Sequence, residues 1–418
     1  MDVPSIPAIG TIVNDDKATF TIANSTVIEG DVLAFTVLLS NAVQGGVTMA
    51  YTLSDDTAKA SDSDYVNSPT PLVFTGVQGE LLTIHVPTLS DTKVEIDETM
   101  KVLPGVVTPG GAGVDPADFS FVNPFSIGTI ENDDYAELLV SPATTTEGGA
   151  LSFVVQLSAA VQDGLTVQYA TQNGTASTVD GDYAAASGTL TFAGTSGETK
   201  TVTVSTLNDT KFESAETLSL RLNNIRLRIP NISYGGFITT PAAGGLGTIL
   251  DDDTADITVT DVSITEGGNL QFSVRLSAAV QGGVLVDYAT SDVSATLADA
   301  DYGQVTGTLQ FQGNAGEVKT VAVPTLADTA LEANEQLNLL LSNARPVDPA
   351  LAGGGLTVAK SIGLGTILND DTSSVSISDV SVTEGGNLQF EVRLGNAVQG
   401  GLTVAYQSSD GTAVATDD

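Results

Sequence analysis

The sequence has no cysteine, no tryptophan and one histidine among its 418 residues. Without cysteine the chain can form neither disulfides nor thiolate metal sites. Lysine and arginine are also scarce, with 14 against 51 aspartates and glutamates, and the formal net charge is −37. Because nucleic acids and anionic membrane surfaces are bound through basic patches, neither is expected as a partner. The acidity favours cations instead.

Long hydrophobic runs are missing as well. No apolar stretch approaches the roughly 18–20 residues that span a bilayer, so no membrane insertion is expected in this segment. The first ten residues, MDVPSIPAIG, contain neither the basic nor the apolar region of a signal peptide. An export signal is therefore expected elsewhere, in a longer protein of which this chain is a piece. The apolar content of 41% is nevertheless enough to build folded cores.

What the sequence does contain is a long internal repeat. The acidic triplets NDD, NDD, DDD and NDD start at Asn14, Asn132, Asp251 and Asn369, which are 118, 119 and 118 residues apart. The segment AVQ-x-G and an early EGG or EGD recur with the same period. Several markers that share one period indicate tandem copies of one unit. We therefore predict the end of one repeat at 1–16, repeat 1 at 17–134, repeat 2 at 135–253, repeat 3 at 254–371 and a truncated repeat 4 at 372–418.

Within each repeat the hydrophobic pattern is that of β-strands. Segments such as LSFVVQL, LTVQYAT and TKTVTVSTL alternate apolar and polar residues and are rich in valine, threonine and leucine. Glycine, asparagine and aspartate separate these segments, and no stretch has a convincing helical pattern. About seven short strands in ~118 residues predict an all-β fold, namely tandem immunoglobulin-like antiparallel β-sandwiches with about 118 residues per repeat.

The acidic residues concentrate at predicted strand ends and turns. Because the loops of a sandwich cluster at its two ends, these residues can gather at one end of each repeat. Two like charges about 4 Å apart repel by about 4 kcal/mol at an effective dielectric of ~20, so a group of about seven needs a counter-ion. Calcium takes about 6–8 oxygen ligands and tolerates irregular geometry. In repeat 2 the positions concerned are Glu147, Asn173, Asp209, Glu213, Glu216 and Asp251 to Asp253.

Five motifs recur in register: TEGG, the loop SDGTA with its variants, an Asp-Tyr step, the turn DT-x-x-E-x-x-E and the final NDD or DDD. Together they resemble the Calx-beta domain, a family found in the regulatory region of sodium–calcium exchangers and in many bacterial surface proteins. The resemblance covers nearly the whole chain and implies Ca²⁺ as the bound ion. Asn173 stands where the family pattern has an aspartate. The ligands that the resemblance implies are Glu29, Asp55, Asp91, Glu95, Glu98, Asp133, Asp134, Glu147, Asn173, Asp209, Glu213, Glu216, Asp251, Asp252, Asp253, Glu266, Asp292, Asp328, Glu332, Glu335, Asp370 and Asp371.

Three features allow other interpretations. Asp64–Tyr65 and its two counterparts are interpreted as turns that place a tyrosine in the core, with a ligand role for the aspartate as the alternative. A glycosidase pair of carboxylates is disfavoured because the acids recur in every repeat and tryptophan is absent. The segment GGAGVDPAD at 110–118 matches a calcium-binding nonapeptide once. Because such sites need stacked copies, this segment is interpreted as a hairpin extension.

These observations predict a calcium-binding rod of tandem β-sandwiches from a large extracellular or cell-surface protein of the bacterial adhesin type. Calcium is expected to rigidify the domain junctions, because each acidic triplet directly precedes the next repeat. The expected partners are calcium ions and neighbouring repeats, with no enzymatic activity and an unidentified adhesive target. The alternative is a calcium-sensing regulatory module of a membrane transporter or of a cell-communication receptor, associated with the membrane through another part of the protein.

Overall fold

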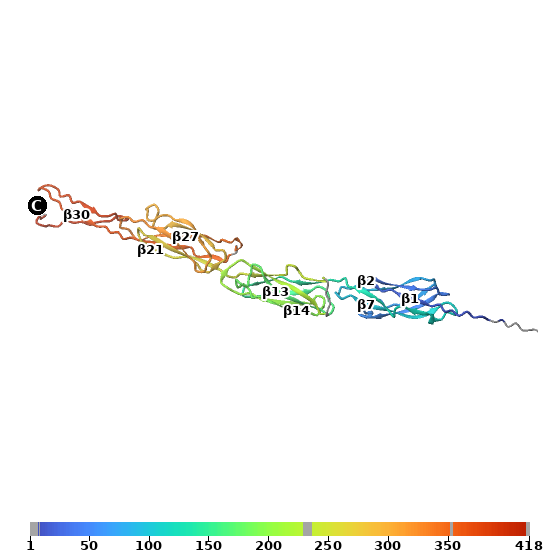
Figure 1. Cartoon of the computed structure of the whole chain (residues 1–418). Helices are drawn as coiled ribbons and strands as arrows, with labels where there is room; N and C mark the ends of the chain where they lie inside the picture. Colours follow the sequence, from blue (N-terminus) through green and yellow to red (C-terminus); the bar gives the residue numbers. More distant parts are fainter. Residues whose placement is uncertain (1–6, 8, 229–235, 352–353, 415–418) are drawn as a thin grey trace, which may run out of the picture. The chain divides into compact units, whose positions relative to one another are not determined.

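The computed structural model describes residues 7, 9–228, 236–351 and 354–414. Over these residues the regular structure is β-strand, apart from the short 3₁₀ turns η1 (Ala60–Asp62), η2 (Pro116–Asp118) and η3 (Pro349–Leu351). This confirms the predicted all-β class (Figure 1). None of the described helices has the length and apolar content needed to cross a membrane.

Repeat 1 is a sandwich of two sheets. One sheet has the strand order β6-β3-β1-β8 and the other the order β2-β9-β7-β4-β5. In β3 every second side chain is buried, so that Phe35 and its neighbours along the strand face the other sheet and form the core with Phe20 and Tyr65. The strands are β1 (Ala18–Ile22), β2 (Ser25–Ile28), β3 (Val32–Leu39), β4 (Val47–Asp55), β5 (Leu72–Phe74), β6 (Leu81–Pro87), β7 (Glu98–Pro109), β8 (Phe119–Phe121) and β9 (Ser126–Glu131).

Repeats 2 and 3 have the same architecture. Their four-stranded sheets run β15-β12-β10-β18 and β26-β22-β20-β28, and their five-stranded sheets run β11-β19-β17-β13-β14 and β21-β29-β27-β24-β25. The strands of repeat 2 are β10 (Ala136–Val140), β11 (Ala143–Thr146), β12 (Ala150–Leu157), β13 (Leu165–Asn173), β14 (Ser187–Phe192), β15 (Thr199–Ser205), β16 (Lys211–Phe212), β17 (Glu216–Leu227), β18 (Ile238–Thr239) and β19 (Gly245–Leu250). Those of repeat 3 are β20 (Ala255–Val259), β21 (Val262–Thr265), β22 (Asn269–Leu276), β23 (Ala279–Val280), β24 (Val284–Asp292), β25 (Thr306–Phe311), β26 (Val318–Pro324), β27 (Glu335–Pro346), β28 (Leu356–Lys360) and β29 (Ile362–Leu368).

In the described part of repeat 4, β30 (Val375–Ile377) and β31 (Val392–Leu394) pair with each other. Contacts divide the chain into two compact units. The second unit consists of Thr145–Ala150, Ser205–Glu216 and Ile249–Asp418. The acidic end of repeat 2 therefore lies in the same unit as repeat 3.

The sheets differ from the predicted antiparallel arrangement in one respect. In repeat 1 the early strands β1 and β2 pair in parallel with the late strands β8 and β9. The parallel register of β2 and β9 runs from Ser25 opposite Gly128 to Ile28 opposite Glu131, and the N–H of Glu29 donates to the carbonyl of Glu131 at 3.1 Å. This pairing brings the residue that follows β2 next to the acidic residues that follow β9. Repeat 3 has the same pairing, between β21 and β29.

The glycine of each IGTI or LGTI segment has a packing role. A Cβ on Gly128 in β9 would lie 2.7 Å from the Phe35 ring and 2.8 Å from a methyl of Leu33. A Cβ on Gly247 or Gly365 would lie at similar distances from the corresponding core side chains of repeats 2 and 3. Only glycine therefore lets the last strand approach the core closely enough to place the acidic residues that follow it.

Candidate metal centre

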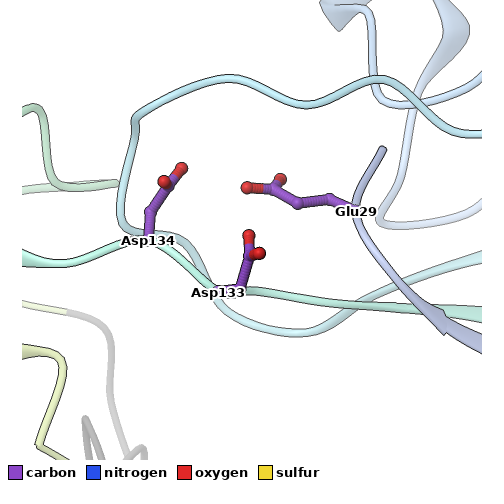
Figure 2. A group of neighbouring side chains, drawn as sticks. All are labelled: Glu29, Asp133 and Asp134. Carbon is purple, nitrogen blue, oxygen red and sulfur yellow. The ribbon is translucent and has the colours of Figure 1, made fainter. Parts of the chain in front are cut away.

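A first group of carboxylates forms where β2 and β9 end. One carboxylate oxygen of each of Glu29, Asp133 and Asp134 lies within 4.8 Å of the others. Figure 2 shows the three side chains pointing toward one another, Glu29 from one segment and the two aspartates from the other. We call this arrangement, and its counterparts in the other repeats, the terminal group. The counterparts are Glu147 with Asp251 and Asp253 in repeat 2, and Glu266 with Asp370 and Asp371 in repeat 3.

Several oxygens of the terminal groups are buried without a partner. A buried carboxylate oxygen without a hydrogen bond is rare in folded proteins, because its desolvation costs free energy that nothing offsets. The same positions recur in successive repeats: the early glutamate in repeats 1 and 2, and the last aspartate of the acidic triplet in repeats 1, 2 and 3. Among the described residues, the buried side-chain oxygens without a hydrogen-bond partner are Glu29 Oε1, Asp134 Oδ2, Glu147 Oε1, Asp253 Oδ2 and Asp371 Oδ2.

The electrostatics agree with this geometry. Burial, and then the adjacent Asp134, raises the pKa of Glu29 to about 8. Burial, and then the charge of Asp253, raises the pKa of Glu147 to about 7. Burial also raises the pKa of Asp251 to about 6. Without a cation these groups take up protons at a pH where ordinary carboxyls are ionised. A bound cation would remove both the repulsion and the proton.

A second group lies at the DT-x-x-E-x-x-E turn. In repeat 1, Asp64, Glu95 and Glu98 each place a carboxylate oxygen within 4.8 Å of the others. Glu98 is the first residue of β7 and only 8% exposed. Burial, and then the adjacent Asp64, raises its pKa to about 8. We call this arrangement the turn group. Its counterpart in repeat 2 is Asp182 with Glu213 and Glu216, and in repeat 3 the corresponding residues Asp301, Glu332 and Glu335 line one cavity. The Nζ of Lys93 forms an ion pair with Glu95, and Lys211 forms the equivalent ion pair with Glu213.

One small cavity connects the two groups. Its volume is about 20 Å³, enough for a water molecule or a single ion. Both Glu29 of the terminal group and the three members of the turn group line it, together with Asp91 and Asn132. In repeat 3 an equivalent cavity is lined by Glu266, Asp301, Asp328, Glu332, Glu335 and Asn369.

The turn itself is held by its first aspartate. Asp91 Oδ1 accepts a hydrogen bond from the N–H of Lys93 at 2.6 Å. Asp209 and Asp328 make the same bond two residues ahead, at 2.7 and 2.6 Å. Such a bond fixes the local turn and uses one oxygen of each aspartate, which leaves the other oxygen for an ion.

The first residue of each acidic triplet ties the two groups together. The side-chain carbonyl of Asn132 accepts from the N–H of Glu95 at 2.8 Å, and its amide donates to the carbonyl of Asp134 at 3.2 Å. Asn369 makes both bonds in repeat 3, each at 3.0 Å. In repeat 2, Asp251 accepts from the N–H of Glu213 at 3.0 Å. The triplet therefore acts as a connector as well as a source of ligands.

The predicted loop ligands have a different environment. Asp55 accepts hydrogen bonds from the hydroxyl of Tyr65 and from the N–H of Ala60. Asn173 and Asp292 likewise accept from Tyr183 and Tyr302. In each loop this residue therefore accepts a hydrogen bond from a tyrosine of the same repeat. Their role as ligands stays a prediction.

The remaining predicted ligands lie within or beside these groups. Asp252 is exposed, and after burial and the charge of Asp209 its charge contributes to the raised pKa of Asp253. Asp209 acts on the pKa of Glu147, which burial raises, in both directions: a backbone hydrogen bond lowers this pKa and the charge of Asp209 raises it. Glu216 is the first residue of β17 and forms a group with Asp182 and Glu213, and Glu335 is half-buried at the start of β27.

Several residues have a larger role than the sequence alone predicts. The sequence favours a turn role for Asp64, and the structure adds a second one: its Oδ2 accepts from the N–H of Lys59 at 2.6 Å, and it belongs to the turn group. Tyr65, which follows it, is buried as expected. The connecting role of Asn132 was not anticipated, although its alignment with Asp251 could have indicated it. The 110–118 segment contains turn η2, capped by Asp115, whose side chain accepts from the N–H of Ala117.

Comparison with known proteins places the chain in a family. A protein-family model described as "Calx-beta domain" matches residues 14–108, 132–239, 250–361 and 369–418. Sodium/calcium exchanger 3 of Mus musculus is 27% identical over 219 residues, which are 48% of this chain and 23% of the exchanger. Sodium/calcium exchanger 1 of Bos taurus is 28% identical over 197 residues, which are 44% of this chain and 20% of the exchanger. The chain thus spans less than a quarter of these relatives.

Solved structures that match the chain include CBD12 from CALX1.2 and the apo form of the Calx CBD1 domain. The first has 20% identity and a TM-score of 0.25, and the match covers 55% of this chain and 99% of that one. The second has 20% identity and a TM-score of 0.24, and the match covers 28% of this chain and all of that one.

Proposed function

The chain belongs to the Calx-beta domain family, and from that premise we propose that it is a calcium-binding array whose terminal and turn groups hold the ions. The observation that supports this most directly is the recurrence of buried carboxylate oxygens without hydrogen-bond partners in repeats 1, 2 and 3. The last aspartate of the acidic triplet contributes such an atom in all three repeats and the early glutamate in repeats 1 and 2, and a cation would satisfy them.

The donor set suits calcium best. All candidate ligands offer oxygen, which excludes the thiolate and imidazole sites that zinc and copper prefer. Magnesium requires near-ideal octahedral geometry at about 2.0–2.1 Å, whereas calcium accepts about 6–8 oxygens in irregular arrangements. The terminal group and the turn group lie beside one cavity, on loops that follow different strands. This irregular arrangement fits calcium better than magnesium. In repeat 1 the proposed ligands come from Glu29, Asp91, Glu95, Glu98, Asp133 and Asp134, with Asp64 added.

We assign these groups to binding rather than catalysis. The carboxylates recur at equivalent places in successive repeats, as expected of a structural ion site. Calcium there would neutralise repulsion between the loops and hold the end of each repeat in one arrangement. The proposed role of the array is therefore that of a calcium-rigidified spacer in a large extracellular, adhesin-like protein.

Several features of the sites lower their affinity for calcium, and a low affinity favours an extracellular location. Lys93 and Lys211 pair with proposed ligands, and the raised pKa values of Glu29 and Glu98 make protons competitors near neutral pH. Extracellular calcium modules work at dissociation constants of about 10⁻⁴–10⁻³ M, and cytosolic sensors at about 10⁻⁷–10⁻⁵ M. A sensor module of a membrane transporter is the second candidate, because the relatives are sodium/calcium exchangers. A micromolar or tighter dissociation constant would favour it.

Calorimetric titration of the full chain, combined with thermal melts, tests the proposal. Calcium at about a hundredfold excess over its dissociation constant should stabilise the folded state by roughly 2.7 kcal/mol per site, and magnesium by much less. Glu29→Gln should remove part of the binding heat, whereas the matched control Glu137→Gln, on an exposed residue of β10, should leave it unchanged. Identical melts in calcium and in chelator would overturn the proposal.

A further inference from the structure

The geometry points to one glutamine of each following repeat as a positioning residue for the turn group of the repeat before it: Gln162 acts on repeat 1 and Gln399 on repeat 3. The inference rests on the proposed calcium function and adds a residue that lies outside the repeat whose ion it would help to hold. Its consequence is that a turn group is fully ordered only when the next repeat is in place.

At the junction of repeats 1 and 2, backbone contacts bring the two segments together. The N–H of Val94 donates to the carbonyl of Ala160, and the N–H of Gln162 donates to the carbonyl of Val94, both at 2.9 Å. Val94 and Val161 form a parallel bridge, and each is only 2% exposed. This contact fixes the AVQ-x-G loop of repeat 2 against the DT-x-x-E-x-x-E turn of repeat 1.

The side chain of Gln162 then reaches the turn group. Its amide Nε2 donates to Oε1 of Glu98 at 3.3 Å, and its Oε1 accepts from the N–H of Ile96 at 3.4 Å. One carboxamide thus holds both the backbone and the buried carboxylate of the turn. Since Glu98 has two carboxylate oxygens, the bond to one leaves the other for an ion.

The arrangement recurs at the junction of repeats 3 and 4 with shorter bonds. Nε2 of Gln399 donates to Oε1 of Glu335 at 3.0 Å, and its Oε1 accepts from the N–H of Ala333 at 3.3 Å. The backbone contacts also recur, from Leu331 to the carbonyl of Ala397 and from Gln399 to the carbonyl of Leu331. At both junctions, therefore, the side-chain amide of the equivalent glutamine donates to the equivalent glutamate of the preceding repeat.

The junction of repeats 2 and 3 uses the same elements. Strand β16 pairs in parallel with β23, which sets Phe212 opposite Val280. Phe212 belongs to the buried core cluster of repeat 3. Oε1 of Gln281 accepts from the N–H and the hydroxyl of Ser214, at 3.2 and 2.9 Å. The carbonyl end of the glutamine thus has the same role in all three junctions.

The chemistry explains why the residue is glutamine. A carboxylate that binds an ion is usually oriented by a hydrogen-bond donor behind it, and losing such a donor typically lowers metal affinity about 10–100-fold. A lysine or arginine would supply the donor but would add a positive charge that repels calcium. A neutral amide donates without that repulsion, and its carbonyl satisfies a backbone N–H at the same time.

The test compares calcium binding by four full-length chains: wild type, Gln162→Met, Gln162→Ala and Gln44→Ala. Methionine keeps the length and apolar contacts of glutamine but removes both hydrogen bonds. Gln44 is the matched control, because it occupies the same loop position in repeat 1 and has no recorded side-chain hydrogen bond to a carboxylate among the described residues. Calorimetry reports the affinities, and melts in chelator report any purely structural loss.

We expect Gln162→Met and Gln162→Ala to weaken one class of sites about tenfold while the other classes stay as in wild type, with a small drop of the melting temperature in chelator from the lost hydrogen bonds. Gln44→Ala should match wild type in both measurements. Wild-type affinity in Gln162→Met would show that packing alone matters and would overturn the inference, while the calcium proposal would stand. An equal loss in Gln44→Ala would also overturn it. Absence of binding by wild type would overturn the proposed function itself, and the inference with it.

Discussion

The hydroxyl of Tyr65 donates a hydrogen bond of 2.6 Å to the carboxylate of Asp55, ten residues earlier in the chain. The bond connects the end of β4 to a tyrosine buried in the core. It lowers the pKa of Asp55 and, together with burial, raises that of Tyr65. The equivalent bond in repeat 2 joins Tyr183 to Asn173. An asparagine is tolerated there because the tyrosine needs an acceptor and either side chain offers one.

Replacing Tyr65 by phenylalanine should therefore loosen the loop between β4 and β5 more than replacing Asp55 by asparagine. Loss of the hydroxyl should reduce local stability by about 1 kcal/mol, the usual contribution of one hydrogen bond. Asp55→Asn keeps the acceptor and should cost less. Hydrogen–deuterium exchange of peptides from residues 51–66, measured in chelator, reads out the local change. Equal protection losses in the two variants would contradict this account.

Lys93→Ala should strengthen calcium binding by repeat 1. The ammonium group of Lys93 pairs with Glu95 in the turn group, so that calcium must compete with a cation already present. Partly exposed pairs contribute about 0.2–1 kcal/mol, which corresponds to a gain of about 1.4- to fivefold in affinity. Calorimetry on the full chain measures this gain.

Repeat 3 provides the reverse experiment, because Ala330 occupies the position of Lys93. Ala330→Lys should weaken a site by a similar factor. Lys101→Ala is the matched control, since Lys101 pairs at 2.7 Å with Asp56, outside both carboxylate groups of repeat 1. A gain in affinity from Lys101→Ala equal to that from Lys93→Ala would mean that overall charge, and not the turn group, sets the affinity.

The metal-free chain should lose stability as the pH rises from about 5 to about 8. In this range folded Glu29 and Glu98, whose pKa values are raised to about 8, bind protons that they release on unfolding. The folded state then holds more protons than the unfolded state, so the free energy of unfolding falls with increasing pH and levels off above the folded pKa values. Thermal melts in chelator between pH 5 and 9 measure this trend.

Saturating calcium should reverse this dependence, because the ion replaces the protons and binds the ionised form. Calorimetry at pH 7 in buffers of different ionisation enthalpy should detect protons released on binding. Glu29→Gln should flatten the chelator profile in part. A metal-free chain whose melting temperature rises steadily from pH 5 to 8 would show that the raised pKa values are not those of the folded state.

The sequence was sufficient for everything that depends on local pattern. The alternation in segments such as Val32–Leu39 predicted the strands, and the period of the acidic triplets predicted which aspartates would recur. What it could not supply depends on pairing between distant segments. The parallel register of β2 and β9 joins residues about a hundred positions apart, and no local pattern distinguishes it from an antiparallel one.

The same limit explains the residues that were undervalued. Asp64 has the local signature of a turn residue, and its second role depends on Glu95 and Glu98, some thirty positions further along. Gln162 was visible only as part of a repeated segment, since its partner Glu98 lies in a different repeat. The repeated segment shows that the glutamine recurs, but the pattern within one repeat does not show which residue of the neighbouring repeat it contacts.

The junction contacts also bear on how such a protein can change its length over evolutionary time. Each whole repeat contains both the AVQ-x-G loop and the DT-x-x-E-x-x-E turn. Every copy therefore carries both segments that make the contact between neighbouring repeats. The apolar residue of the turn varies, as Val94, Phe212 and Leu331, while the facing residue is valine in all three cases. Gain or loss of one whole repeat by unequal recombination would recreate the same contact between the loop and the turn at the new junction. The interface would not have to evolve again, so the number of repeats could change under selection for the length of the protein alone.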